Sequence, residues 1–260
     1  MSPSPAVVAV SGLAVVLVAM TLLWVVSVRL RDASIVDPFW GPGFAIVTAT
    51  YLVVDGRYVE RGLLAFVLVA AWAARLGWHL LRRNRKEGED KRYAAMREEG
   101  GPGWTFRSLF TVFWLQAGLL WIISAPLLAG VTSTAPLGAW DLAGTLVFLV
   151  GLAVESLADL QLARFKADPA NRGKVLDTGL WRYSRHPNYF GEFVLWWGLW
   201  LVALGAGAWW SVVGPLLISF LLLKVSGVTM LERSMEETRP GYEEYVRRTS
   251  TFVPWPPKDA

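Results

Sequence analysis

Residues 179–192 read Gly179-Leu180-Trp181-Arg182-Tyr183-Ser184-Arg185-His186-Pro187-Asn188-Tyr189-Phe190-Gly191-Glu192, and a tryptophan-rich apolar run follows them. Pro187 is typical of the first turn of a helix, where its missing N–H has no partner to lose. Asn188 and Glu192 are four residues apart and share one face of that helix. Glu192 would lie about one turn inside the membrane, where an ionisable group costs roughly 2.5–3.5 kcal/mol on insertion scales. The stretch therefore predicts a membrane helix that carries either a functional site or a membrane-edge salt bridge with an aromatic belt.

The whole chain has the composition of a membrane protein. Of its 260 residues, 54% are apolar and fifteen are tryptophan, and the mean hydropathy is +0.41. A hydrocarbon core about 30 Å thick needs roughly 20 apolar residues to cross it. We therefore predict one all-α membrane domain over residues 1–260 with seven transmembrane helices, at about 6–28, 35–54, 62–81, 107–130, 139–160, 189–206 and 209–229.

The placement of the basic residues predicts the orientation of these helices. The connections 82–107 and 161–188 and the tail after residue 229 hold most of the Lys and Arg, whereas the connections 131–138 and 203–208 hold none. The positive-inside rule then puts the N-terminus outside and the C-terminus in the cytoplasm. Richness in Ala, Val, Gly and Arg suggests a bacterial cytoplasmic membrane. The absence of cysteine excludes disulfides, thiol nucleophiles and Cys metal sites.

Cations are concentrated just before the start of the sixth predicted span. Residues 164–185 contain six of them: Arg164, Lys166, Arg172, Lys174, Arg182 and Arg185. Such side chains make charge-assisted hydrogen bonds to phosphate, so a ligand with several phosphates would fit here. The ordinary positive-inside bias explains any single one of these cations as well. The chain has no Gly-x-Gly-x-x-Gly after a strand and no Walker loop, so a dinucleotide would have to bind among membrane helices and cytoplasmic loops.

The octapeptide Arg185-His186-Pro187-Asn188-Tyr189-Phe190-Gly191-Glu192, which opens a late span, resembles the C-terminal signature of the steroid 5α-reductase family, and its bacterial branch in particular. Related signatures occur in sterol reductases, and a shorter Arg-His-Pro-x-Tyr version occurs in isoprenylcysteine-type methyltransferases. The resemblance is good from about Asp159 to the C-terminus and weak before it. The Arg-His-Pro triplet departs from the animal steroid enzymes, which lack it, and this leaves the substrate open.

The resemblance implies NADPH as the cofactor, bound in a cavity that faces the cytosol, and residues 139–260 carry its signature. It implies that Asp159 contacts the adenosine part, and that Asn188 and Glu192 lie near pyrophosphate and nicotinamide. The other contacts expected in this region are Arg164, Lys166, Lys174, Arg182, Tyr183, Arg185, His186, Tyr189 and Tyr245. In the tail, Glu232, Tyr242 and Tyr245 are candidates for a lid over the cofactor, and a surface amphipathic helix is the alternative.

Glu155 and Asp159 form a second pair of residues four apart in sequence. Two carboxylates on one helix face could bind a divalent metal. No His joins them, and the connection that follows is basic. We therefore expect them to pair with Arg or Lys and predict no metal site.

Reduction of an α,β-unsaturated ketone needs a proton donor that stabilises the charge developing on the carbonyl oxygen. Asp37, which precedes Pro38, is the candidate, because burial in an apolar pocket would keep a carboxyl group neutral. The alternative is that Asp37 caps the helix that follows it. Tyr51 is a second candidate for the donor.

Two further regions of the N-terminal half are expected to contact the cofactor. Arg75 lies in the middle of a span, so it must face an acid, water or phosphate. His79, four residues on, extends this polar stripe, although hydrogen-bonded packing is the common role of such a histidine. Arg92 and Tyr93 lie in a segment that also resembles the bacterial branch. Gln116 is a polar residue within a span, to which the sequence assigns no role.

These features together predict an NADPH-dependent reductase that acts on the 4,5 double bond of a 3-keto-4-ene steroid or a similar lipid enone. The first alternative is an S-adenosylmethionine-dependent methyltransferase of the isoprenylcysteine type, and Gly191-Glu192 favours the reductase over it. The second alternative is a non-enzymatic lipid-binding protein of the bilayer. The costly polar groups Asp37, Arg75 and Glu192 argue against it.

Overall fold

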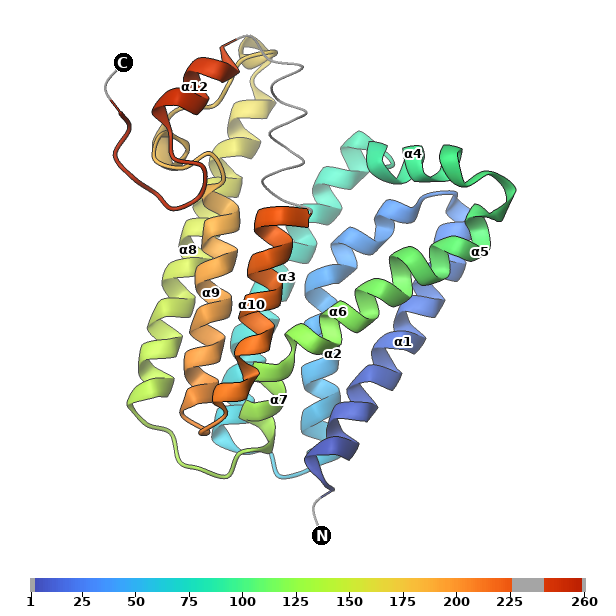
Figure 1. The fold of residues 1–260 in the computed structure, drawn as a ribbon, viewed down its shortest axis with the longest axis vertical. Helices are drawn as coiled ribbons and strands as arrows, with labels where there is room; N and C mark the ends of the chain where they lie inside the picture. Colours follow the sequence, from blue (N-terminus) through green and yellow to red (C-terminus); the bar gives the residue numbers. More distant parts are fainter. Residues whose placement is uncertain (1–2, 226–240, 259–260) are drawn as a thin grey trace. The chain divides into compact units, whose positions relative to one another are not determined.

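The computed structural model describes residues 3–225 and 241–258, with residues 85–87 described by their backbone alone. Helices, turns and irregular connections make up the described residues, without a β-strand, which confirms the all-α prediction. The chain divides into two compact units, residues 1–139 with 202–213 and residues 140–201 with 214–260. The second unit contains almost all of the stretch on which the family resemblance rests. Figure 1 shows the helices of both units.

The first unit is built from the N-terminal helices. They are α1 Pro5–Leu30, η1 Ala33–Ile35, α2 Val36–Asp55, α3 Glu60–Glu87, α4 Lys91–Gly100, η2 Gly101–Gly103, α5 Trp104–Ser108, the π-helical η3 Leu109–Trp114, α6 Leu115–Ile123 and α7 Ala125–Thr132, joined by η6 Trp209–Val212. Helix α2 packs against α1 and α3, α3 packs against α7, and α1 packs against η3 and α6. Helix α2 is thus the centre of this unit.

Small residues allow α2 and α3 to approach closely. Pro42 lies inside α2, where a proline removes a backbone donor and its ring crowds the preceding turn. A methyl group on Gly77 of α3 would lie 3.1 Å from the Pro42 ring and 3.2 Å from the Pro38 carbonyl oxygen. Glycine at this position therefore makes room for the proline-containing turn of α2, the turn that also carries Asp37.

The second unit contains the helices of the C-terminal half. They are α8 Ala139–Ala167, η4 Pro169–Asn171, η5 Gly179–Arg182, α9 Pro187–Leu204, α10 Val213–Phe220, the π-helical η7 Leu221–Val225 and α12 Tyr242–Arg248. Helices α8 and α9 lie side by side (Figure 1). A methyl group on Gly191 would lie 2.7 Å from the Glu155 Cβ, and one on Gly198 would lie 2.6 Å from the Phe148 backbone nitrogen. The two backbones are therefore nearly in contact along this seam.

Four described helical stretches are long and apolar enough to cross a membrane: Pro5–Leu30, Glu60–Asn84, Lys91–Ile123 and Ala139–Ala167, while Trp209–Val225 is a shorter apolar stretch. The four stretches overlap the predicted spans at 6–28, 62–81, 107–130 and 139–160, and the shorter stretch overlaps the predicted span at 209–229. The last of these predicted spans runs beyond residue 225 and so lies partly outside the described residues. The length and apolar composition of these helices agree with the prediction of a membrane protein.

The predicted spans at 35–54 and 189–206 form helices α2 and α9, which are not among the stretches that are long and apolar enough to cross a membrane. Helix α9 has eighteen residues and begins at Pro187. The polar residues Asn188 and Glu192 occupy its first two turns. The predicted span at 107–130 is interrupted at Ser124, between α6 and α7. The number of seven spans and the orientation of the termini remain predictions.

Candidate functional site

A polar cluster surrounds Asp37 in the first unit. The Tyr93 hydroxyl donates a hydrogen bond to Asp37 Oδ1 at 2.8 Å. Arg92 Nη2 lies 3.4 Å and Arg83 Nη2 lies 3.9 Å from Asp37 Oδ2. Gln116 Nε2 donates to the Tyr93 hydroxyl at 3.4 Å. Tyr93 is buried and 17% of the Asp37 side chain is exposed, so the cluster is largely shielded from the surface of the unit.

The connection between α3 and α4 holds this cluster in place. Asp90 caps α4 by accepting a hydrogen bond from the Arg92 backbone N–H at 2.9 Å. It also accepts from Arg92 Nε and Nη2, each at 2.9 Å, so the guanidinium is held by two parallel bonds. Burial alone would raise the pKa of Asp90, but these hydrogen bonds and the charges of Arg92 and Arg83 lower it below its ordinary value. Asp90 thereby fixes Arg92 beside Asp37.

Two hydrogen bonds tie the same connection to the turn before α2. The Ala33 N–H donates to Glu89 Oε1 at 3.0 Å, and Asn84 Nδ2 donates to the Ser34 carbonyl oxygen at 3.2 Å. Asp32 closes that turn by accepting from the Ser34 N–H at 2.8 Å. Segments about fifty residues apart in sequence are thus held together where Asp37 begins its helix.

The surroundings of Asp37 differ from those expected from the sequence. Burial is found, but the apolar pocket is not, because a phenol and two guanidinium groups face the carboxyl group. The carboxyl group is therefore hydrogen-bonded to Tyr93 instead of lying among apolar side chains, and the role of Asp37 as a neutral proton donor remains a prediction. Arg92 and Tyr93 were expected at the cofactor, and in this unit both contact Asp37. Their contact with a cofactor remains a prediction.

Three other predicted residues, Tyr51, Arg75 and His79, belong to the first unit. Tyr51 is buried, and its hydroxyl lies 2.9 Å from Ser124 Oγ. That bond accounts for Tyr51 as a core residue. Arg75 and His79 are four residues apart on α3, so they share one face of the helix. Both residues are partly buried.

A second group of predicted residues comes together in the second unit. Asn188 Nδ2, in the first turn of α9, donates to Asp159 Oδ1 of α8 at 3.2 Å. Asp159, Glu155 and Glu192 are all buried. Asn188 Oδ1 is buried as well, and none of the described residues donates a hydrogen bond to it. Buried polar atoms are nearly always hydrogen-bonded, so this oxygen is an acceptor for which the described chain supplies no donor.

The turn before α9 is anchored on α8. The Trp181 indole N–H donates to the Ala158 carbonyl oxygen at 3.1 Å, and the Leu180 N–H donates to Gln161 Oε1 at 2.9 Å. The imidazole of His186 stacks on the Tyr189 ring with 5.8 Å between centroids and 11° between planes. Predicted residues from Asp159 to Glu192 therefore share one end of the α8–α9 pair.

The predicted phosphate contacts have a different environment. Arg164, Lys166, Lys174 and Arg182 are exposed, and Tyr183 is 43% exposed. Arg164 and Lys166 lie in the last turn of α8, where cations also favour the negative end of the helix dipole. Their contact with phosphate remains a prediction.

Arg185 and Tyr245, also predicted at the cofactor, both contact other segments of the second unit. Arg185 donates to the carbonyl oxygens of Val246 and Thr249, at 3.0 Å each. The Tyr245 hydroxyl donates to the Trp181 carbonyl oxygen at 2.5 Å. Tyr242 is buried beside Tyr245, whereas Glu232, the third lid candidate, lies outside the described residues.

Sequence reasoning missed Asp90, Arg83 and the glycine seam. Asp90 directly precedes the helical segment that begins at Lys91, so helix-capping preferences could have identified it. The glycine pairs Gly144 with Gly151 and Gly191 with Gly198 have the same spacing of seven, which places each pair on one helix face. That spacing was a signal for a close helix pair. Arg83 carried no such signal among its basic neighbours.

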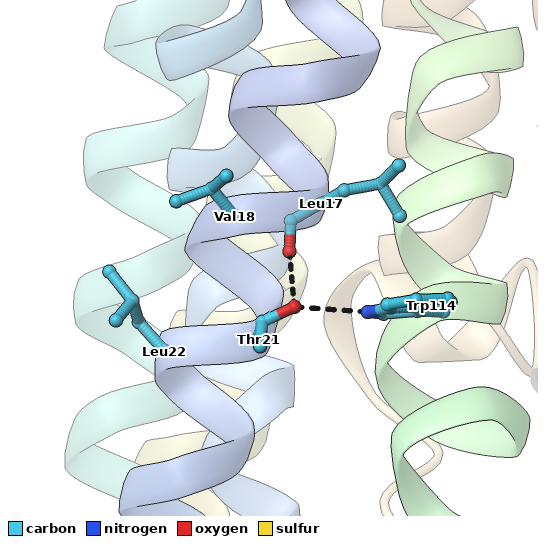
Figure 2. Close-up of a pocket in the computed structure, with 5 residues that line it drawn as sticks. All are labelled: Leu17, Val18, Thr21, Leu22 and Trp114. Carbon is cyan, nitrogen blue, oxygen red and sulfur yellow. Dashed lines mark hydrogen bonds between the residues drawn. The ribbon is translucent and has the colours of Figure 1, made fainter.

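An apolar groove of about 270 Å³ lies on the first unit, away from the predicted residues (Figure 2). Its lining residues are Leu17, Val18, Thr21, Leu22 and Trp114. The Trp114 indole N–H donates to Thr21 Oγ1 at 3.0 Å, and Thr21 Oγ1 donates to the Leu17 carbonyl oxygen at 2.7 Å. Both walls belong to helical stretches that are long and apolar enough to cross a membrane. Among the described residues, no cluster of three or more His, Asp or Glu could hold a metal ion.

Comparison with known proteins places the chain in a family. A family model described as "Protein of unknown function (DUF1295)" matches residues 23–249. A fission yeast (Schizosaccharomyces pombe) relative, "Uncharacterized protein C594.04c", is 28% identical over 278 residues, which cover 94% of this chain and 79% of the relative. "Probable O-methyltransferase ustE" of Ustilaginoidea virens is 40% identical over 53 residues, 20% of this chain and 18% of that protein. No solved structure matches. Because the family model covers most of its length, the chain belongs to the DUF1295 family.

Proposed function

We propose that the protein is an NADPH-dependent reductase that saturates the carbon–carbon double bond of a lipid enone, such as a 3-keto-4-ene steroid. The observation that carries this proposal is the hydrogen bond from the buried Tyr93 hydroxyl to the partly buried Asp37, 2.8 Å long. Hydride addition to an enone moves charge onto the carbonyl oxygen, and a hydrogen-bond donor held in a dry site stabilises that charge. Methyl transfer and lipid binding develop no such charge on a carbonyl oxygen, so they give no reason for a shielded phenol.

The second unit offers residues that suit the cofactor. The buried Asn188 Oδ1 lacks a donor among the described residues, and the carboxamide N–H of a nicotinamide is a donor of the right kind. Asp159 holds the other end of the Asn188 amide, so the acceptor is fixed in orientation. The exposed cations of residues 164–182 would contact the phosphates. When bound, NADPH supplies the hydride.

The chain's own part of the reaction is assigned to the cluster around Asp37. Tyr93 would turn its single hydroxyl hydrogen from Asp37 Oδ1 to the substrate carbonyl oxygen, while Gln116 keeps its hydrogen bond to the phenol oxygen. As the β-carbon gains hydride, the electron pair of the double bond moves toward oxygen, and the resulting enolate is stabilised by the Tyr93 O–H. Arg92, 3.4 Å from Asp37, balances the negative charge of the pair. A proton from water then reaches the α-carbon and gives the saturated ketone.

The test mixes purified protein with NADPH and a 3-keto-4-ene steroid. The reaction rate is measured as the loss of NADPH absorbance. Tyr93→Phe keeps the ring and removes the hydroxyl, so we expect the rate to fall about 10²–10⁴-fold, the usual contribution of a positioned proton donor, with NADPH affinity unchanged. Tyr58→Phe is the matched control, because Tyr58 is 52% exposed in the connection between α2 and α3. An unchanged rate in Tyr93→Phe would remove the phenol from the mechanism.

A second candidate function is supported by one specific finding. The partial match to a probable O-methyltransferase covers 53 residues, and the Arg-His-Pro-x-Tyr pattern is shared with isoprenylcysteine-type methyltransferases. Thermal unfolding of the purified protein with each cofactor separates the two functions, because a ligand that binds only the folded state raises Tm. We expect NADPH to raise Tm. A rise with S-adenosylmethionine alone would favour the methyltransferase.

A further inference from the structure

Arg185 is a buried cation that is directed at the C-terminal end of the chain. Only 8% of the residue is exposed. Its Nη1 donates to the carbonyl oxygens of Val246 and Thr249 at 3.0 Å each, and its Nη2 donates to Thr251 Oγ1 at 2.7 Å. The Arg185 backbone N–H donates to the Ser250 carbonyl oxygen at 2.8 Å. One residue therefore binds four positions of the segment 245–255, which we call the C-terminal strap.

Neighbours of Arg185 hold the same strap on either side. Ser184 Oγ donates to the Phe252 carbonyl oxygen at 2.8 Å, and the Trp255 N–H donates to the Tyr183 carbonyl oxygen at 3.0 Å. At the other end of the strap, the Tyr245 hydroxyl donates to the Trp181 carbonyl oxygen at 2.5 Å. The strap thus lies across the turn that precedes α9, bound largely through backbone carbonyl oxygens.

The strap also touches the first turns of α9 themselves. The Phe252 ring meets the Phe190 and Phe193 rings edge-on, with centroids 5.8 Å and 5.6 Å apart. Ser184 Oγ, which donates to the strap, also accepts from the His186 N–H at 3.1 Å. Asn188 lies between these contacts in the sequence. The strap therefore braces the backbone on both sides of Asn188.

We propose that Arg185 is a positioning residue that clamps the C-terminal strap and, through the strap, fixes the start of α9 and the amide of Asn188. A planar guanidinium presents N–H donors in a rigid fork, and this fork is matched to the spaced acceptors of Val246, Thr249 and Thr251. Lysine carries a compact ammonium on a flexible stem and cannot reproduce the fork. The effect of Arg185 on cofactor affinity rests on the proposed function, whereas the clamp itself does not.

The first experiment needs no cofactor. Amide hydrogen exchange of the full-length, detergent-solubilised protein is measured by mass spectrometry on peptides that cover residues 184–193 and 245–255. We expect both peptides to exchange about tenfold faster or more in Arg185→Ala, because several buried hydrogen bonds are lost together. Arg185→Lys should recover only part of the protection.

Arg182→Ala is the matched control, since Arg182 lies three residues before Arg185 and is exposed. Its exchange should equal that of the wild type. Thr251→Val tests the strap side if Arg185→Ala does not fold, because it removes one acceptor and keeps the shape; a smaller acceleration is expected. Unchanged protection of both peptides in Arg185→Ala, or in Thr251→Val if only that variant folds, would overturn the proposal.

A double-mutant cycle separates action through the strap from direct contact with cofactor. Arg185→Ala and Phe252→Ala should each weaken NADPH binding, and the double variant should bind about as weakly as the weaker single variant, because both act through one element. If the fold-changes of the two single variants in the NADPH dissociation constant multiply in the double variant, the positioning role is overturned in favour of a direct phosphate contact. If the wild-type protein does not bind NADPH, the proposed function fails, and the exchange experiment alone decides the clamp.

Discussion

The polar cluster of the first unit and the Asn188–Asp159 pair of the second unit differ in how far the chain satisfies its own polar atoms. Both oxygens of Asp37 face donors, from Tyr93 on one side and Arg92 and Arg83 on the other. Asn188 Oδ1 is buried without a donor among the described residues. Leaving a buried acceptor unsatisfied costs about 1–3 kcal/mol, so a chain keeps one where another molecule supplies the donor.

This difference assigns different tasks to the two regions. The cluster around Asp37 is complete, so it is suited to holding a phenol in one orientation. The Asn188 amide is held at one end by Asp159 and open at the other, so it is suited to binding. Substitutions in the two regions should therefore divide into those that lower the free energy of unfolding and those that lower ligand affinity.

The largest effect on stability is expected at Gly191, on the helix seam beside Asn188. A methyl group there would lie 2.7 Å from both the Glu155 Cβ and the Gly151 carbonyl oxygen. Because backbone atoms cannot give way as a flexible side chain can, Gly191→Ala must push α8 and α9 apart. We expect a loss of about 3 kcal/mol, the upper part of the range for overpacking, seen as a lower Tm in detergent.

Gly118→Ala is the control for that variant. A methyl group on Gly118 of α6 would meet no atom within 4 Å, and alanine is favoured over glycine in a helix by about 1 kcal/mol. Its Tm should be equal to or above that of the wild type. A wild-type Tm in Gly191→Ala would show that the seam is looser than its geometry indicates, and that Asn188 is not rigidly placed.

Removing Asp37 and removing Asn188 should have opposite signatures. Asp37→Ala leaves Tyr93, Arg92 and Arg83 without their shared acceptor, so we expect the free energy of unfolding to fall by about 1–3 kcal/mol. Asn188→Ala removes one bond to Asp159 together with the unsatisfied oxygen, so its stability cost should stay below about 1 kcal/mol. Its affinity for NADPH should fall about tenfold, the equivalent of one hydrogen bond.

Denaturation and NADPH titration of the same samples measure both quantities. Asp37→Asn is a useful companion, since it keeps the shape and one oxygen while removing the charge that faces the two arginines. It should lie between the wild type and Asp37→Ala in stability. If Asn188→Ala binds NADPH as the wild type does, the open acceptor is not a cofactor contact, and the contrast between the two regions loses its functional meaning.

The sequence predicted the helical class and the position of most helices, because apolar length and charge placement are local properties. The break of the 107–130 span at Ser124 did have a local signal that the prediction missed, because Pro126 lies in the first turn of α7 and proline is typical of a helix start. Helix α9 was predicted as a span from its tryptophans, although its first turns are polar. Local pattern therefore identified elements better than it identified their membrane role.

The same limit explains the site. The shared face of Asn188 and Glu192 follows from helix geometry. The family resemblance implied that Asp159 belongs to the same site, and the Asn188 amide is hydrogen-bonded to Asp159. The partners of Asp37 and Arg185 did not follow, because they lie 46 or more residues from Asp37 and 61 or more residues from Arg185 in the sequence. A charge in a sequence shows that a partner is needed but not which distant segment provides it.

The smallest effect is expected at Asp90, whose charge completes the cluster of the first unit. Its pKa is lowered in the folded protein, so the ionised form stabilises the fold at pH values above the unfolded pKa of about 3.9, and this contribution is lost as the pH falls through the lower folded pKa. Asp90→Asn keeps a good helix cap but removes the charge beside Arg92, so it should cost less than about 1 kcal/mol at pH 6 and nothing well below pH 3. Asp90→Ala also loses the cap, which adds about 1 kcal/mol that does not vanish in acid. Chemical denaturation of the three proteins across pH 2–7 measures these differences. A gap between Asp90→Asn and the wild type that stays constant over this range would show that the Asp90 charge does not support the cluster.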